Sequence, residues 1–232
     1  MKQSTGRFGV HYLAVIAGVV GYFFHATFQS GGSRMPLIVF SVLVSLLFLL
    51  SAAALRKDAA YEAVFRASKL DAVLSVAGAL AIGAAGGMMI SGSVFQKILA
   101  VLGILGGIGT AAAANSRVRG AKPQPFWMIF PTLFYVATLF YNFRHWMVDP
   151  AIIDYAFSLF ALICFMIASY QAAAFCFDRG SRRQLQFFAL GGVFFGLTAA
   201  AGGSIAEMLL YLGGALTMLA LARQAGTKVE GV

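Results

Sequence analysis

The stretch PLIVFSVLVSLLFLLSAAAL, residues 36–55, contains no charged side chain. About 20 apolar residues in a helix cross the hydrocarbon core of a bilayer. Backbone amides must be hydrogen-bonded within lipid, and these runs are too long for barrel strands, so they predict helices. Similar runs fill most of the chain, and they cover residues 9–28, 71–91, 94–114, 126–146, 150–176, 185–202 and 204–222. The sequence therefore predicts an all-α, polytopic transmembrane helix bundle with eight spans.

The composition excludes several classes of protein. Hydrophobic residues make up 60% of the 232 residues and charged residues only 11%, whereas soluble domains carry about 25% charged residues. The net charge of +9 comes from Lys and Arg in short gaps between apolar runs, which favours membrane lipids over nucleic acid as partners. Cys164 and Cys176 lie about 18 Å apart along one span, too far for a disulfide. No Cys/His cluster has metal-ligand spacing, so neither a metal nor a cofactor is expected.

The distribution of basic residues predicts the orientation. With eight spans, the other side of the membrane receives only Arg34, Lys97 and Arg144, and the remaining 14 of the 17 Lys and Arg residues fall on one side. Lys and Arg concentrate in cytoplasmic gaps, so both termini are expected in the cytoplasm. A seven-span arrangement breaks this alternation, and residues 9–28 lack the cleavage site of a signal peptide.

Two halves of the chain share a series of short matches in the same order. Residues 1–120 and 121–232 are predicted to be tandem four-helix units. The matching pairs are Phe23 and His25 with Phe143 and His145, Pro36 with Pro150, residues 84–87 with 200–203, and Ser93-x-x-Gln96 with Ser204-x-x-Glu207. An even number of spans gives both units the same orientation, so they would be related by an axis along the membrane normal.

Small residues at a spacing of four predict close helix packing. In lipid, helices associate by backbone approach more than by apolar burial, so Gly103→Leu is expected to impair folding. The predicted packing residues are Gly83, Gly87, Gly103, Gly107, Gly192 and Gly196. Residues 57–70 form the one sizeable polar stretch, in which Tyr61, Val64 and Phe65 share one helical face. This pattern predicts a short cytoplasmic surface helix, with docking of a protein partner as the alternative.

Polar residues at the outer ends of the spans form the candidate transport site, since ionisable groups in a membrane are functional candidates. Asp154 is the strongest candidate, because it lies one turn inside its span. The predicted site comprises Asp154, Arg144, Glu207, His145 and Asn142. The alternative readings are structural: Ser204-x-x-Glu207 has the pattern of a capping box, and Arg144 and His145 can extend to the headgroups.

The second half resembles a family of bacterial polytopic membrane proteins that has no assigned activity. The resemblance covers about residues 126–215 and rests on Tyr141-Asn-Phe-Arg144, Asp149-Pro150, Asp154-Tyr155, Tyr170-Gln-Ala-Ala-Ala-Phe175, and Arg179-Gly-Ser-Arg-Arg183 before Phe187-Phe188. It implies a multi-pass protein of the bacterial cytoplasmic (inner) membrane and transfers no site residues.

Two functions fit these features. The duplication and the outer charged cluster favour a small transporter or channel-like protein, by analogy with transporters built from parallel repeats. The scarcity of charge within the spans and the segment 57–70 favour a non-catalytic scaffold or accessory subunit. No protease, esterase or nucleotide-binding motif is present in the sequence, so an enzyme is not expected.

Overall fold

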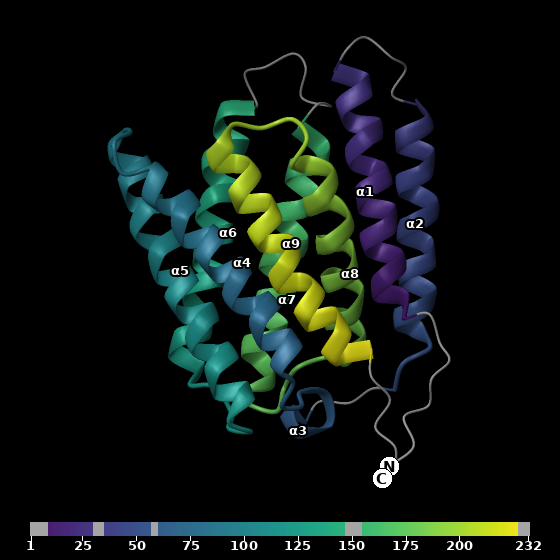
Figure 1. The fold of residues 1–232 in the computed structure, drawn as a ribbon, viewed down its shortest axis with the longest axis vertical. Coiled ribbons are helices and arrows are strands. Elements are labelled where there is room, and N and C mark those ends of the chain that lie inside the picture. Colours follow the sequence, from purple (N-terminus) through teal and green to yellow (C-terminus); the bar gives the residue numbers. More distant parts are fainter. Residues whose placement is uncertain (1–8, 30–34, 57–59, 147–154, 227–232) are drawn as a thin grey trace.

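The computed structural model describes residues 9–29, 35–56, 60–146 and 155–226 (Figure 1). These ranges are helical apart from connecting turns, and contain no strand. The helices are α1 (Val10–Gln29), α2 (Met35–Ala53), α3 (Tyr61–Val64), α4 (Lys69–Met88), α5 (Val94–Val118), α6 (Pro125–Trp146), α7 (Ala156–Phe175), α8 (Arg182–Ala199) and α9 (Ile205–Gly226). The predicted all-helical class is confirmed.

Seven of these helices are long and apolar enough to cross a membrane: α1, α2, α4, α5, α6, α7 and α9. The eighth long helix, α8, begins with Arg182, Arg183 and Gln184, which lower its apolar content. Its remaining residues are mostly buried and are apolar except Gln186 and Thr198, and the helix packs against α1, α2, α7 and α9. The structure thus agrees with a multi-pass membrane protein.

Six helices form a closed ring in which each helix packs against two neighbours. The order around the ring is α4, α5, α6, α7, α8 and α9, and α9 returns to α4. Outside this ring, α1 and α2 lie together at one side and both contact α8 (Figure 1). Contacts such as α1 on α8 and α4 on α9 join the two predicted repeat units, whose duplication stays a prediction.

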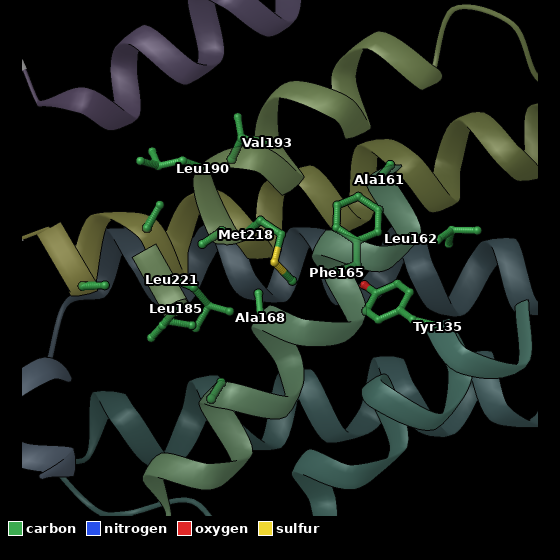
Figure 2. Packing of buried hydrophobic residues seen from close by; sticks show 14 of the residues in the cluster. Tyr135, Ala161, Leu162, Phe165, Ala168, Leu185, Leu190, Val193, Met218 and Leu221 are labelled. Carbon is green, nitrogen blue, oxygen red and sulfur yellow. The ribbon is translucent and has the colours of Figure 1, made fainter. Parts of the chain in front are cut away.

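The ring is filled by large side chains from α6, α7, α8 and α9. Phe165 of α7 lies beside Tyr135 of α6, with 5.2 Å between the ring centroids, and both side chains are fully buried. Figure 2 shows Met218 of α9 approaching the same region from the other side. These side chains close the centre of the bundle between its two ends.

Glycines allow α4 to pack closely on both α5 and α9. A Cβ on Gly103 of α5 would lie 3.0 Å from the Cα of Gly86 of α4, and one on Gly107 would lie 2.7 Å from the carbonyl oxygen of Ala79. Around Gly83 and Gly87, in contrast, a Cβ would have open space. A Cβ on Gly107 would nevertheless lie 3.3 Å from the Cα of Gly83, so Gly83 faces α5, and Gly86 in place of Gly87 lies against Gly103.

The other predicted glycines lie on α8. A Cβ on Gly192 would lie 2.7 Å from Cγ of Met218, and one on Gly196 would lie 2.8 Å from Phe165 and 3.1 Å from the carbonyl oxygen of Tyr211. Both therefore face α7 and α9, where a side chain would displace the core. Small residues at these two positions leave room for the side chains of α7 and α9.

The segment between α2 and α4 differs from its prediction. Only one helical turn, α3, forms within residues 60–68, and Phe65 after it is extended. Tyr61, Val64 and Phe65 do share a face, but this face is buried in the bundle, where Phe65 packs edge-on against Phe175 of α7. The segment therefore covers one end of the ring and does not form a helix on the surface. We call this end of the ring the α3 end.

Polar groups of several helices meet at the α3 end. The Nε of Arg223 in α9 lies 2.7 Å from Oδ1 of Asp71 in α4, and Nε of Arg182 in α8 donates to the carbonyl oxygen of Ala225 at 2.8 Å. Arg223 also lies 3.4 Å from the Tyr12 hydroxyl. The first turn of α1 and the last turn of α9 therefore lie at the same end of the bundle (Figure 1).

A second ion pair lies on the surface of this end. Nζ of Lys122 is 2.6 Å from Oδ2 of Asp178, and the backbone N–H of Tyr61 donates to Oδ1 of the same carboxylate at 2.8 Å. The hydrogen bond from Lys122, followed by that from Tyr61, lowers the pKa of Asp178 from its ordinary value. The carboxylate is therefore ionised at neutral pH and ties α3 to the end of α7.

Candidate functional site

The outer cluster predicted from sequence is only partly described. Asp154 lies outside the described residues, as does the side chain of His145. Arg144 is exposed near the end of α6, and Asn142 two residues earlier is half-buried. Within the described ranges, neither side chain forms an ion pair or hydrogen bond with Glu207. The structure therefore does not bring these three predicted residues together.

Glu207 has a structural role at the start of α9. Its Oε2 accepts the backbone N–H of Ser204 at 2.8 Å, while the hydroxyl of Ser204 accepts the N–H of Glu207 at 3.4 Å. Ser93 and Gln96 make the same pair of bonds at the start of α5. These bonds satisfy the free N–H groups of a helix start. They leave Oε1 of Glu207 available to another group.

A groove of about 1100 Å³ lies on the side of the bundle. Residues of α2 and α7 form its two walls, and α8 forms its floor. Its lining is mainly aromatic and aliphatic, and includes Leu37, Ile38, Val42, Leu46, Leu49, Phe157, Phe160, Ile163, Phe187, Phe188 and Phe195. From Leu37 to Leu49 the groove follows α2 for about 18 Å.

The groove exists because α2 packs mainly on α8, while α7 packs on α6 and α8. Bulky side chains on α8, such as Phe187 and Phe195, stand between the two walls. Val42, Leu46 and Phe160 line the groove and are each about half exposed. The groove is therefore open along its side, in the zone where a bilayer would surround the protein.

One end of the groove is polar and lies opposite the α3 end. Here Nδ1 of His25 is 2.9 Å from the carbonyl oxygen of Thr198. Because a carbonyl oxygen only accepts, Nδ1 carries the proton, which leaves Nε2 as an acceptor whenever the ring is neutral. Glu207 lines the same end and adds carboxylate oxygens. This end therefore offers acceptors to a group that donates hydrogen bonds.

A buried hydroxyl lies beside these acceptors. Tyr211 of α9 lines the groove, is 2% exposed, and its hydroxyl has no well-aligned hydrogen bond to a described residue. Ser158 of α7, also in the lining, is its polar neighbour. A buried hydroxyl without a good partner costs free energy, so a bound polar group that pairs with Tyr211 would be stabilised.

The sequence indicated Glu207 as part of the outer polar cluster, but it did not predict the groove that this residue lines. Its only sequence signal is the pair Ser41 and Ser45, which interrupts the apolar span 36–55 at a spacing of one turn. Ser41 donates to the carbonyl oxygen of Leu37 in its own helix at 2.7 Å. Such serines are common within spans, so the pair alone does not indicate a cavity.

The described residues contain no cluster of His, Cys, Asp or Glu that could hold a metal ion. In comparisons with known proteins, no family model, no curated protein and no solved structure matches the chain. The candidate function is therefore argued from the groove and its residues.

Proposed function

We propose that this membrane protein binds a lipid in the groove between α2 and α7, with a headgroup that donates hydrogen bonds. The observation that carries the proposal is the combination of an apolar groove of about 1100 Å³ with an acceptor-rich end. Acyl chains would occupy the part lined by Phe187 and Phe195. The headgroup would meet His25 and Glu207.

The ethanolamine headgroup of a phospholipid has the chemistry that this end selects. Its ammonium carries three N–H donors, which suit Nε2 of His25 and the carboxylate of Glu207. The choline headgroup has a cationic nitrogen of the same charge but no N–H donor. The proposed site therefore distinguishes these two lipids by hydrogen bonding, with acyl chains kept equal.

We also propose that the chain crosses the bacterial cytoplasmic membrane eight times, with α8 as one of the spans. The chain enters α8 at the α3 end and leaves it at the opposite end, because α9 begins there and ends beside Asp71. The 18 residues of α8 extend about 27 Å, close to the ~30 Å hydrocarbon core. Basic residues gather at the α3 end, which we place in the cytoplasm together with both termini. The groove then receives lipid from the outer leaflet.

This assignment gives the predicted transporter a class of substrate, namely an amphiphile that enters sideways from the bilayer. An aqueous route for a small polar solute has less support, because Tyr135, Phe165 and Met218 fill the centre of the ring. The scaffold alternative would place a helix of a partner protein in the groove in place of lipid.

Native mass spectrometry of the protein in a mild detergent tests the proposal. With dioleoyl-phosphatidylethanolamine we expect one tightly bound lipid, and at least about tenfold weaker binding of dioleoyl-phosphatidylcholine, since hydrogen bonds to a charged group are worth about 1.5–3 kcal/mol. Ser45→Phe fills the groove and should abolish this binding. Leu47→Phe adds an aromatic ring on the outward side of α2, outside the groove lining, and should not.

Equal lipid binding by Ser45→Phe and Leu47→Phe would refute the groove as the site. Equal binding of the two lipids by the unmodified protein would refute the selection of the headgroup. A protein that co-purifies in place of lipid and is displaced by Ser45→Phe would favour the scaffold function.

A further inference from the structure

Arg117 is a buried cation without a carboxylate partner among the described residues. It lies in the last turn of α5, is 8% exposed, and its Nε has no hydrogen-bond partner in the described part of the chain. Asp71 and Asp178 at this end already pair with Arg223 and Lys122. A charge buried within a membrane bundle is costly unless another group compensates it.

Aromatic groups of the α3 segment cover Arg117 but do not neutralise it. The guanidinium carbon lies 4.6 Å from the ring centroid of Phe65, a cation–π contact. The hydroxyl of Tyr61 is a near neighbour, and burial raises the pKa of this hydroxyl, so it stays protonated. The α3 segment therefore separates a positive charge from the water at that end.

A small cavity of about 30 Å³ lies beside Arg117, inside the ring. Hydroxyl groups reach it from α4, α5, α6, α7 and α9, and they belong to Ser75, Thr110, Tyr135, Ser169 and Thr217. A cavity of this size holds one or two water-sized particles. Five helices thus bring polar groups to one point in a core that is otherwise apolar.

The chemistry of this lining selects an anion. Arg117 supplies a permanent positive charge and an unused N–H, and no carboxylate is among the lining residues. Thr110 and Thr217 donate to carbonyl oxygens of their own helices, and the Tyr135 hydroxyl is hydrogen-bonded with Thr217. The hydroxyls of Ser75 and Ser169 can rotate to donate into the cavity. A monovalent, monoatomic anion would satisfy both the charge and the space.

We propose that Arg117 and the surrounding hydroxyls form a binding site for a halide ion, chloride being the abundant one, inside the ring. This site is separate from the lipid groove, which lies on the other side of α8 and shares none of its lining residues. The proposal therefore does not depend on the proposed lipid function.

The test is the melting temperature of the full-length protein in detergent, titrated with sodium chloride against sodium gluconate at constant ionic strength. Gluconate is too large for the cavity. We expect a saturable rise in melting temperature with chloride and none with gluconate, because a ligand that binds only the folded state stabilises it. Arg117→Met should abolish the response, and Arg119→Gln, which removes an exposed arginine two residues away, should preserve it.

Ser169→Ala provides a second variant that keeps the charge and makes only a small change in volume. It removes one donor and should raise the half-saturating chloride concentration by about tenfold, which keeps the test decisive if Arg117→Met does not fold. Identical responses to chloride and gluconate in the unmodified protein would overturn the proposal. An unchanged chloride response in Arg117→Met, or in Ser169→Ala if the former cannot be purified, would do the same.

Discussion

Replacing Gly78 with alanine is expected to lower the melting temperature of the detergent-solubilised protein by about 5–10 °C. A Cβ on Gly78 of α4 would lie 2.5 Å from the carbonyl oxygen of Gly213 and 2.6 Å from Cγ2 of Thr217, both in α9. The backbone oxygen cannot rotate away, so the two helices must separate. Overpacking of this kind costs about 1–3 kcal/mol. Thermal unfolding followed by circular dichroism measures the loss.

Gly83→Ala is the matched control, because it makes the same change five residues further along α4. A Cβ on Gly83 has no atom within 4 Å, and alanine favours a helix over glycine by up to about 1 kcal/mol. The melting temperature should therefore stay the same or rise slightly. Equal losses in the two variants would mean that the contact between α4 and α9 is not the cause, and an unchanged Gly78→Ala would contradict the close approach itself.

Gly78 has a close neighbour in α9 and Gly83 has open space around its Cβ position, and the sequence alone does not predict this difference. Apolar runs locate the spanning helices to within a few residues, because lipid leaves the backbone few alternatives. Small residues at a spacing of four also indicate that helices approach closely. Which glycine makes contact depends on where two helices cross and how each is rotated, and neither quantity is written in the local sequence.

The local sequence also could not predict which charged side chains are buried. Asp71, Arg117 and Arg223 fall in gaps or at the ends of apolar runs, which is the pattern of groups that reach water. Arg117 is buried because the segment after α2 folds back over the ring and inserts Phe65. The pattern of residues 57–70 predicted a shared apolar face correctly, but a segment that inserts into its own bundle has the same pattern as one that lies on a membrane.

The groove between α2 and α7 could not be predicted for a related reason. It depends on a gap between α2 and α7, two helices that are not consecutive in the chain, and on the size of the side chains that α8 places between them. All three helices are apolar along the groove. A wall of the groove and a face covered by a neighbouring helix therefore have the same composition.

Asp71→Asn is expected to lower the melting temperature by about 6–12 °C, because it removes the partner of Arg223. The Asp71 side chain is 7% exposed and that of Arg223 is 25% exposed. Breaking a buried pair costs about 3–5 kcal/mol, mainly because one charge remains without compensation. Since Arg223 retains some contact with water, the lower part of this range is expected, about 3 kcal/mol.

Asp178→Asn provides the comparison at the exposed pair with Lys122. Its side chain is 49% exposed and that of Lys122 is 40% exposed, so water compensates for much of the lost attraction. Asp178 has a positive φ of 54°, a conformation that asparagine also tolerates. The backbone is therefore not strained by the change, and a melting temperature close to that of the unmodified protein is expected.

A double variant separates the loss of attraction from the cost of an unpaired charge. Asp71→Leu combined with Arg223→Met removes both charges and keeps apolar volume, and such replacements are often neutral. It should therefore recover most of the melting temperature lost in Asp71→Asn. If the double variant is as unstable as Asp71→Asn, the contribution of Asp71 comes from its place in the first turn of α4 and not from Arg223, since a carboxylate there also interacts favourably with the helix dipole.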